Sequence, residues 1–131
     1  MNRFVLLCYN TTENRFHWDF LFEEPDACKT FSAAQNLVEE ARKTGTLQCV
    51  VTPLADHRLA YLDHEGPVSG NRGFVKRLDF GTYRTIDGTI HFQGQLCKGT
   101  VDLRDDFLVL MLVKQPALTE FLAAQSGVRQ S

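Results

Sequence analysis

Apolar and polar residues alternate along most of this chain, with the period of two that is typical of half-buried β-strands. In the clearest example, the segment 15–23, aromatic residues occupy the even positions and mostly polar residues occupy the odd positions. We expect the aromatic face, Phe16, Trp18, Phe20 and Phe22, to point into the core. The same pattern predicts further strands over the ranges 4–9, 29–33, 47–54, 73–78, 81–86, 89–96, 100–103 and 107–114.

Turns and two helices are predicted between or after these strands. Residues 10–14 are typical of a hairpin connection, and Asp87-Gly88 and Lys98-Gly99 predict the turns of the last hairpins. Helical spacing over 35–43 is followed by Gly45, a typical C-terminal cap, and a second helix is predicted over 116–125. About eight short strands with one or two peripheral short helices predict a mainly β protein, a small closed or nearly closed β-barrel.

The composition limits the class of protein. The 131 residues are expected to form a single domain spanning 1–131. Apolar residues make up 44% and charged residues 23%, which is typical of a globular chain. Fourteen basic and sixteen acidic residues leave a net charge of −2. This balance excludes a globally basic nucleic-acid binder but allows a local phosphate site.

The chain carries no obvious targeting signal. No apolar run approaches the roughly 20 residues of a membrane span, and residues 1–8 predict a first strand rather than a signal peptide. The four cysteines include no Cys-x-x-Cys pair, which argues against a zinc ribbon or a redox motif. We expect a cytoplasmic protein with reduced, buried thiols and no membrane partner; a secreted protein with two disulfides is the alternative.

His17 and Asp19 form the first candidate site. Two residues apart on a strand, they project from the same face with side chains about 6–7 Å apart. This face is opposite the aromatic one, so it points to solvent or to a concave site. An imidazole and a carboxylate at this spacing can reach one divalent ion. The alternative is a solvated polar face.

The second candidate is the segment 56–67, which concentrates titratable side chains. His57 can bind or protonate a phosphate as a cation or acid, and Tyr61 can donate from its hydroxyl. The alternative is an exposed turn with a polar rim, in which Leu59, Tyr61 and Leu62 plug the barrel.

Residues 66–84 are the one locally basic stretch, and the best candidate for contact with a nucleic-acid backbone. Its glycines can also present backbone N–H groups to an anion. On an edge strand the same charges would only keep the edge soluble. The cations are Arg72, Lys76, Arg77 and Arg84.

Several short motifs occur in the order and spacing of a known family. Together they resemble the 3′-phosphoesterase domain of bacterial DNA ligase D, and more closely its short stand-alone relatives, over residues 3 to about 114. The motifs are Phe16-His17-Trp18-Asp19-Phe20, Lys29-Thr30-Phe31, Asp56-His57-Arg58-Leu59-Ala60-Tyr61-Leu62-Asp63-His64-Glu65-Gly66 with the following Pro67-Val68-Ser69-Gly70, Gly81-Thr82-Tyr83, Leu96-Cys97-Lys98-Gly99 and Leu110-Met111-Leu112-Val113-Lys114.

The resemblance implies a small β-barrel that trims nucleic-acid 3′ ends in DNA repair. Such enzymes remove a terminal ribonucleoside and then a 3′-phosphate with a divalent metal, usually manganese. Carried over by motif, His17 and Asp19 are metal ligands. His57 contacts the scissile phosphate and Tyr61 supports that contact.

The chain also departs from the family pattern. A further metal-binding His upstream of His17 is replaced by Tyr9 in strand register, or by Thr11 when counted back along the chain. Leu21, Gln35 and Cys49 stand near positions where the family has cations. These losses leave three hypotheses open: a metal-dependent 3′-phosphoesterase, a degenerate relative that binds a nucleic-acid end or another phosphorylated ligand, and a protein-interaction barrel. The oligomeric state is not determined by the sequence.

Overall fold

The computed structural model describes residues 2–11, 15–33, 37–68, 70, 72–104 and 107–114, and it confirms the predicted mainly β fold. The helices are α1 (Leu37–Thr44) and the short 3₁₀ helix η1 (Leu59–Leu62). The strands are β1 (Arg3–Asn10), β2 (Phe16–Glu23), β3 (Cys28–Ala33), β4 (Thr46–His57), β5 (Gly66–Pro67), β6 (Phe74–Ile86), β7 (Thr89–Gly94), β8 (Cys97–Arg104) and β9 (Phe107–Lys114).

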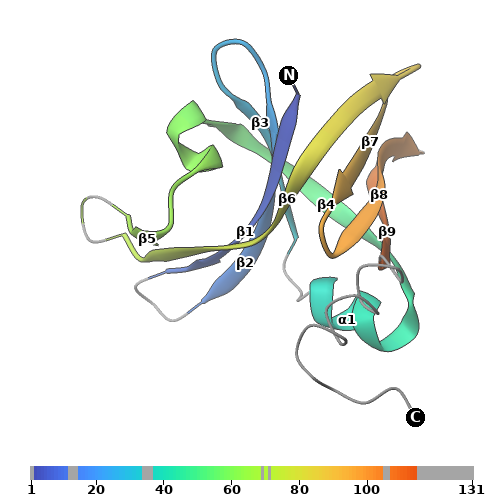
Figure 1. The fold of residues 1–131 in the computed structure, drawn as a ribbon, viewed down its shortest axis with the longest axis horizontal. Coiled ribbons are helices and arrows are strands. Elements are labelled where there is room, and N and C mark those ends of the chain that lie inside the picture. Colours follow the sequence, from blue (N-terminus) through green and yellow to red (C-terminus); the bar gives the residue numbers. More distant parts are fainter. Residues whose placement is uncertain are drawn as a thin grey trace.

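Eight of these strands close into an antiparallel barrel (Figure 1). The hydrogen-bonded order is β1-β2-β3-β4-β9-β8-β7-β6, and β6 pairs back onto β1. The short strand β5 is added to β6 outside this circuit. Closure pairs the backbone groups that two sheet edges would otherwise expose.

The barrel interior is filled by large apolar side chains, as the alternation predicts. Phe4, Phe22 and Phe92 meet there, with ring centroids 4.9–6.0 Å apart. These rings belong to a cluster that also contains Leu6, Phe20, Phe31, Ala33, Val51, Ile90, Cys97, Val101, Leu110 and Leu112. Their burial provides the main apolar driving force for closing the barrel.

A second apolar cluster lies on the outer face of β1 and β2. Val5, Leu7 and Leu21, at odd positions, pack there against Leu62 of η1 and Val68. The segment that follows β4 therefore covers the barrel wall from outside. The alternative in which Leu59, Tyr61 and Leu62 plug the barrel is wrong, because Leu62 packs on this outer cluster and Leu59 is exposed.

The prediction that all four aromatic residues of β2 point into the core is wrong for Phe16, which is 50% exposed. β3 pairs with β2 only from Trp18 onward, and β7 pairs with β6 only from Gly81 onward. The ends of β1, β2 and β6 thus extend beyond the rest of the barrel (Figure 1). Phe16 lies on this extension, where no described strand packs opposite it.

The two strands predicted over 73–78 and 81–86 are one continuous strand, β6. Its pairing with β1 shifts from Leu6–Asp79 to Leu7–Arg77, so Leu78 has no partner and forms a bulge. Gly81, which begins the second of the two predicted strands, lies within β6. A glycine is needed there because β7 approaches closely: a Cβ would lie 1.9 Å from the Gln93 carbonyl oxygen.

The turn predictions are confirmed in one case and wrong in another. Asp87 and Gly88 join β6 to β7, with φ angles of 50° and 82°. Lys98 and Gly99 instead lie within β8, and the chain turns at Gln95-Leu96. The buried Asp79 carboxylate accepts hydrogen bonds from the backbone N–H groups of that turn. This side chain, rather than a glycine in the turn, therefore stabilises the change of chain direction.

The first predicted helix is confirmed as α1, and Gly45 follows it with a φ of 86°. Residues 35–36 of that prediction, residues 12–14 of the first hairpin connection and the helix predicted over 116–125 lie outside the described residues.

We expect Asp79→Ala to lower the free energy of unfolding by about 2–4 kcal/mol, because it removes the acceptor of the backbone N–H groups of Gln95, Leu96 and Cys97, the last of which is buried. Urea unfolding followed by circular dichroism measures this change. Asp26→Ala, at an exposed bend, is the control and should change stability by less than about 0.5 kcal/mol. Equal effects of the two variants would contradict the role given to Asp79.

Candidate functional site

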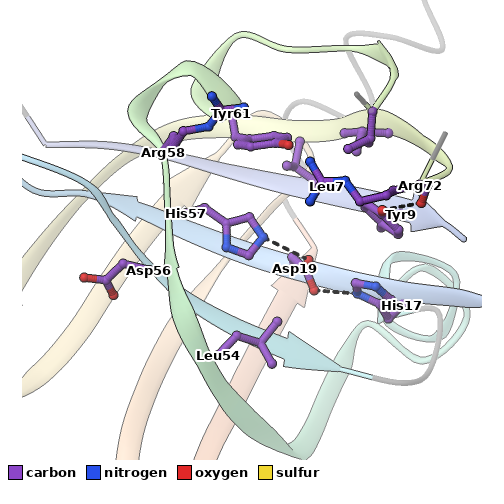
Figure 2. Close-up of a pocket in the computed structure, with 12 residues that line it drawn as sticks. Leu7, Tyr9, His17, Asp19, Leu54, Asp56, His57, Arg58, Tyr61 and Arg72 are labelled. Carbon is purple, nitrogen blue, oxygen red and sulfur yellow. Dashed lines mark hydrogen bonds and ion pairs between the residues drawn. The ribbon is translucent and has the colours of Figure 1, made fainter. Parts of the chain in front are cut away.

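A pocket with a volume of about 550 Å³ lies on the outer wall of the barrel (Figure 2). β1 and β2 form its floor, and the segment from the end of β4 to η1 forms its side. The lining residues are Leu7, Tyr9, His17, Asp19, Leu54, Asp56, His57, Arg58, Tyr61, Val68, Arg72 and Val75. His17, Asp19, His57 and Tyr61, predicted from two separate motifs, therefore share one pocket.

Asp19 is at the centre of the polar part of this pocket and is almost fully buried. Its Oδ1 lies 2.8 Å from Nδ1 of His17, and its Oδ2 lies 3.8 Å from Nε2 of His57. The two imidazoles thus flank one carboxylate (Figure 2). Because burying a carboxylate is costly without such partners, these contacts define the positions of all three side chains.

His57 is oriented by the other side of its ring. Its Nδ1 lies 3.2 Å from the carbonyl oxygen of Ala55 and 3.2 Å from Oγ1 of Thr30. A carbonyl only accepts, so Nδ1 carries the proton in this contact. Nε2 is left facing Asp19 and the pocket, where it can bind an ion, or donate when it is also protonated.

Aromatic rings form the remaining walls. Tyr9 stacks on His17 with centroids 4.9 Å apart, and its hydroxyl donates to the backbone carbonyl of Arg72. Tyr61 meets His57 edge-on at 5.5 Å, and the guanidinium of Arg58 lies 5.7 Å from the Tyr61 ring centroid. Tyr9 thus ties the turn around Arg72 to β1 and closes one side of the pocket.

The predicted basic stretch does not gather at the pocket as a whole. Arg72 lines it. Lys76 follows the pocket residue Val75 on β6 and so points to the opposite face of the strand. Arg77 lies over the ring of Phe80, and Arg84 is in the part of β6 that pairs with β7. Among the described cations, Arg58, which no sequence motif assigned to a phosphate, joins Arg72 in the pocket wall.

Manganese takes imidazole and carboxylate ligands, so the donor types of this pocket fit the ion that the resemblance implies. Two neighbouring donors on a six-coordinate ion with bonds of about 2.1 Å lie about 3 Å apart. The His17–Asp19 separation is close to this value, and the His57–Asp19 separation is longer. No group of three or more His, Cys, Asp or Glu side chains within the described residues is gathered as a metal site. His17 and Asp19 form the closer of the two imidazole–carboxylate pairs in the pocket, and in this structure Nδ1 and Oδ1 share a hydrogen bond.

Tyr9 and Arg58 line the pocket in addition to the four residues predicted for the site. The alternation of β1 places Tyr9 on the same face as Leu7, and the pairing with β2 places it directly opposite His17. This pairing confirms the strand register in which Tyr9 stands where the family has a further metal-binding histidine. Arg58 follows His57 in the sequence, but its direction depends on the chain entering η1.

The cysteines do not contribute a nucleophile to this pocket. None of the four is joined in a disulfide. Cys28 packs in the outer cluster beneath the pocket, and burial raises its pKa to about 11. A thiol with so high a pKa carries little thiolate near neutral pH.

Comparison with known proteins adds no relative: no protein-family model and no curated protein matches this chain. Neither helix in the described part of the chain has the length and apolar character needed to cross a membrane.

We expect Tyr9→Phe to destabilise the protein by about 1 kcal/mol, because it removes the hydrogen bond that ties the Arg72 backbone to β1. Trypsin cleavage after Arg72 in the folded protein should become faster. Tyr61→Phe is the matched control, since the Tyr61 hydroxyl makes no hydrogen bond to a described residue. Unchanged cleavage in Tyr9→Phe would contradict this role for Tyr9.

Proposed function

We propose that this protein is a metal-dependent phosphoesterase that processes nucleic-acid 3′ ends, removing a 3′-phosphate or a terminal ribonucleotide. The supporting observation is that two motifs about forty residues apart line one pocket. His17 and Asp19 come from β2, His57 is the last residue of β4, and Tyr61 lies in η1, which covers the outer wall. The resemblance to the ligase D phosphoesterase family supplies the substrate class, and the pocket supplies side chains suited to a phosphate ester.

His17 and Asp19 are the residues that would hold the ion. A divalent ion supplies a Lewis acid that neutralises charge on a phosphoryl group. Asp19 can serve this role because its burial keeps water from competing for both carboxylate oxygens. Tyr9 stacks on the imidazole of His17 and so limits the rotation of that ring.

His57 and Tyr61 would act on the phosphate and its leaving oxygen. With Nδ1 held by the Ala55 carbonyl, His57 presents Nε2 to the pocket and can deliver a proton from that nitrogen. The Tyr61 hydroxyl is a second donor. Arg58 and Arg72 bring two guanidinium groups to the pocket wall, where they would stabilise the anionic transition state in place of the cations that the family has elsewhere.

The position of the pocket suits the end of a nucleic-acid chain. It lies on the outer wall rather than in the barrel interior, which is filled by apolar side chains. A strand end can therefore reach it without passing through the barrel. Such an encounter needs only a local site and is compatible with the net charge of −2.

A second candidate function is binding of a phosphorylated ligand without catalysis. Leu21, which stands where the family has an arginine, is fully buried in the outer cluster, so that cation has no substitute at the same place. Tyr9, opposite His17, stands where the family has a further metal-binding histidine. The protein-interaction barrel is the remaining alternative.

The deciding experiment is a manganese-dependent assay on a primer–template that carries a 3′-phosphate or a 3′-ribonucleotide. We expect turnover, and we expect His17→Ala and His57→Ala each to lower it by about 10²–10³-fold. His91→Ala, on β7 and not among the pocket-lining residues, is the control and should keep full activity.

The other outcomes separate the alternatives. Absence of turnover together with binding of the 3′-phosphorylated end, weakening as salt is raised, would favour the binding function. Absence of both would overturn the phosphate-site interpretation. Equal loss in all three histidine variants would indicate a general effect on folding and contradict the assigned roles.

A further inference from the structure

A second, smaller cavity adjoins the pocket. It has a volume of about 270 Å³ and shares Arg58, Tyr61 and Val68 with the larger pocket as lining residues. Its remaining walls are Ala60, His64 and Pro67. The cavity lies just below the range of about 300–1,000 Å³ that is typical of small-molecule sites, so it has room for one ring system rather than for an extended chain.

Tyr61 forms the partition between the two cavities, and its ring is held from several sides. His57 contacts it edge-on at 5.5 Å from the side of the larger pocket, and His64 contacts it edge-on at 5.7 Å. Nε2 of His64 lies 2.9 Å from the carbonyl oxygen of Pro67, to which it donates. This contact fixes the imidazole and leaves its other nitrogen as an acceptor.

The chemistry of these walls matches a nucleobase. A guanidinium plane, a tyrosine and an imidazole offer flat surfaces on which a base can stack, while Pro67 and Val68 add apolar contact. Stacking on such groups tolerates any base, because every base has a π-face. Arg58 lines both cavities, so one side chain can contact the phosphate and the adjoining ring.

We propose that the smaller cavity is the subsite for the base of the terminal nucleoside whose 3′-phosphate enters the larger pocket. This inference rests on the proposed function, because it takes the larger pocket to be the phosphate site. The ribose links base and 3′-phosphate, and the two cavities share three lining residues, so one nucleotide can occupy both. The protein would then bind a 3′-phosphorylated end that carries a base more tightly than one that lacks a base.

The test is equilibrium binding with two matched probes in the presence of manganese. One is a phosphonate analogue of adenosine 3′-phosphate, in which a methylene group replaces the bridging oxygen so that it is not hydrolysed; the other is the same phosphonate without the base. By isothermal titration calorimetry, we expect the analogue with the base to bind about ten-fold or more tightly than the abasic one.

Ala60→Trp fills the smaller cavity and should abolish this preference, while the affinity for the abasic probe stays within about two-fold. Leu59→Trp is the matched control: it adds the same side chain to η1 at a residue that lines neither cavity, and the preference should persist. Thermal unfolding of both variants checks that they are folded. The comparison of the two probes on the unmodified protein tests the inference even if a variant does not fold.

The outcomes separate this inference from the function on which it rests. Equal affinity of the unmodified protein for the two probes would overturn the base subsite while leaving the phosphate pocket in place. The same conclusion would follow if Ala60→Trp, but not Leu59→Trp, no longer bound either probe. Failure of both probes to bind the unmodified protein would overturn the proposed function and the subsite with it.

Discussion

Strands β1 and β2 are buried on both faces, and the rest of the structure depends on this constraint. Their even positions place Phe4, Phe20 and Phe22 inside the barrel, while their odd positions place Leu7 and Asp19 on the outer wall. A slip of one residue in the register would exchange these sets and put aromatic rings in the pocket. The same alternation that places aromatic side chains in the core therefore places the polar side chains of the site on the outer wall.

The outer wall becomes a site only because a second segment covers it. Leu62 and Val68 anchor this segment on Val5, Leu7 and Leu21, which is ordinary apolar packing. His57, the last residue of β4, pairs with Cys28 of β3 and lies 3.8 Å from Asp19, next to this segment. Strand pairing therefore positions both imidazoles at the buried carboxylate, and the small outer core positions the segment with Tyr61 that covers the pocket.

Much of the fold could be predicted from the sequence, because alternation is a local property. The aromatic face of β2, the strand at 107–114 and the turn at Asp87-Gly88 follow from residues that are neighbours in the chain. The predictions were wrong where the local backbone structure depends on a residue that is distant in the sequence. Gly81 lies within a strand because β7 approaches it closely, and the chain turns at Gln95-Leu96 because the distant Asp79 holds the N–H groups there.

By itself, the sequence determined which residues share a strand face, and hence that His17 and Asp19 project together, away from the aromatic core. It also determined the barrel class, since strand number and turn spacing are encoded locally. Only the tertiary structure decided that His57, Tyr61, Arg58 and Arg72 join them on the outside of the barrel. The physical reason is that these contacts join residues that are tens of positions apart, so they form only when long loops close. The pairing of β3 with β4 and the packing of Leu62 and Val68 on the outer cluster then set the position of each segment.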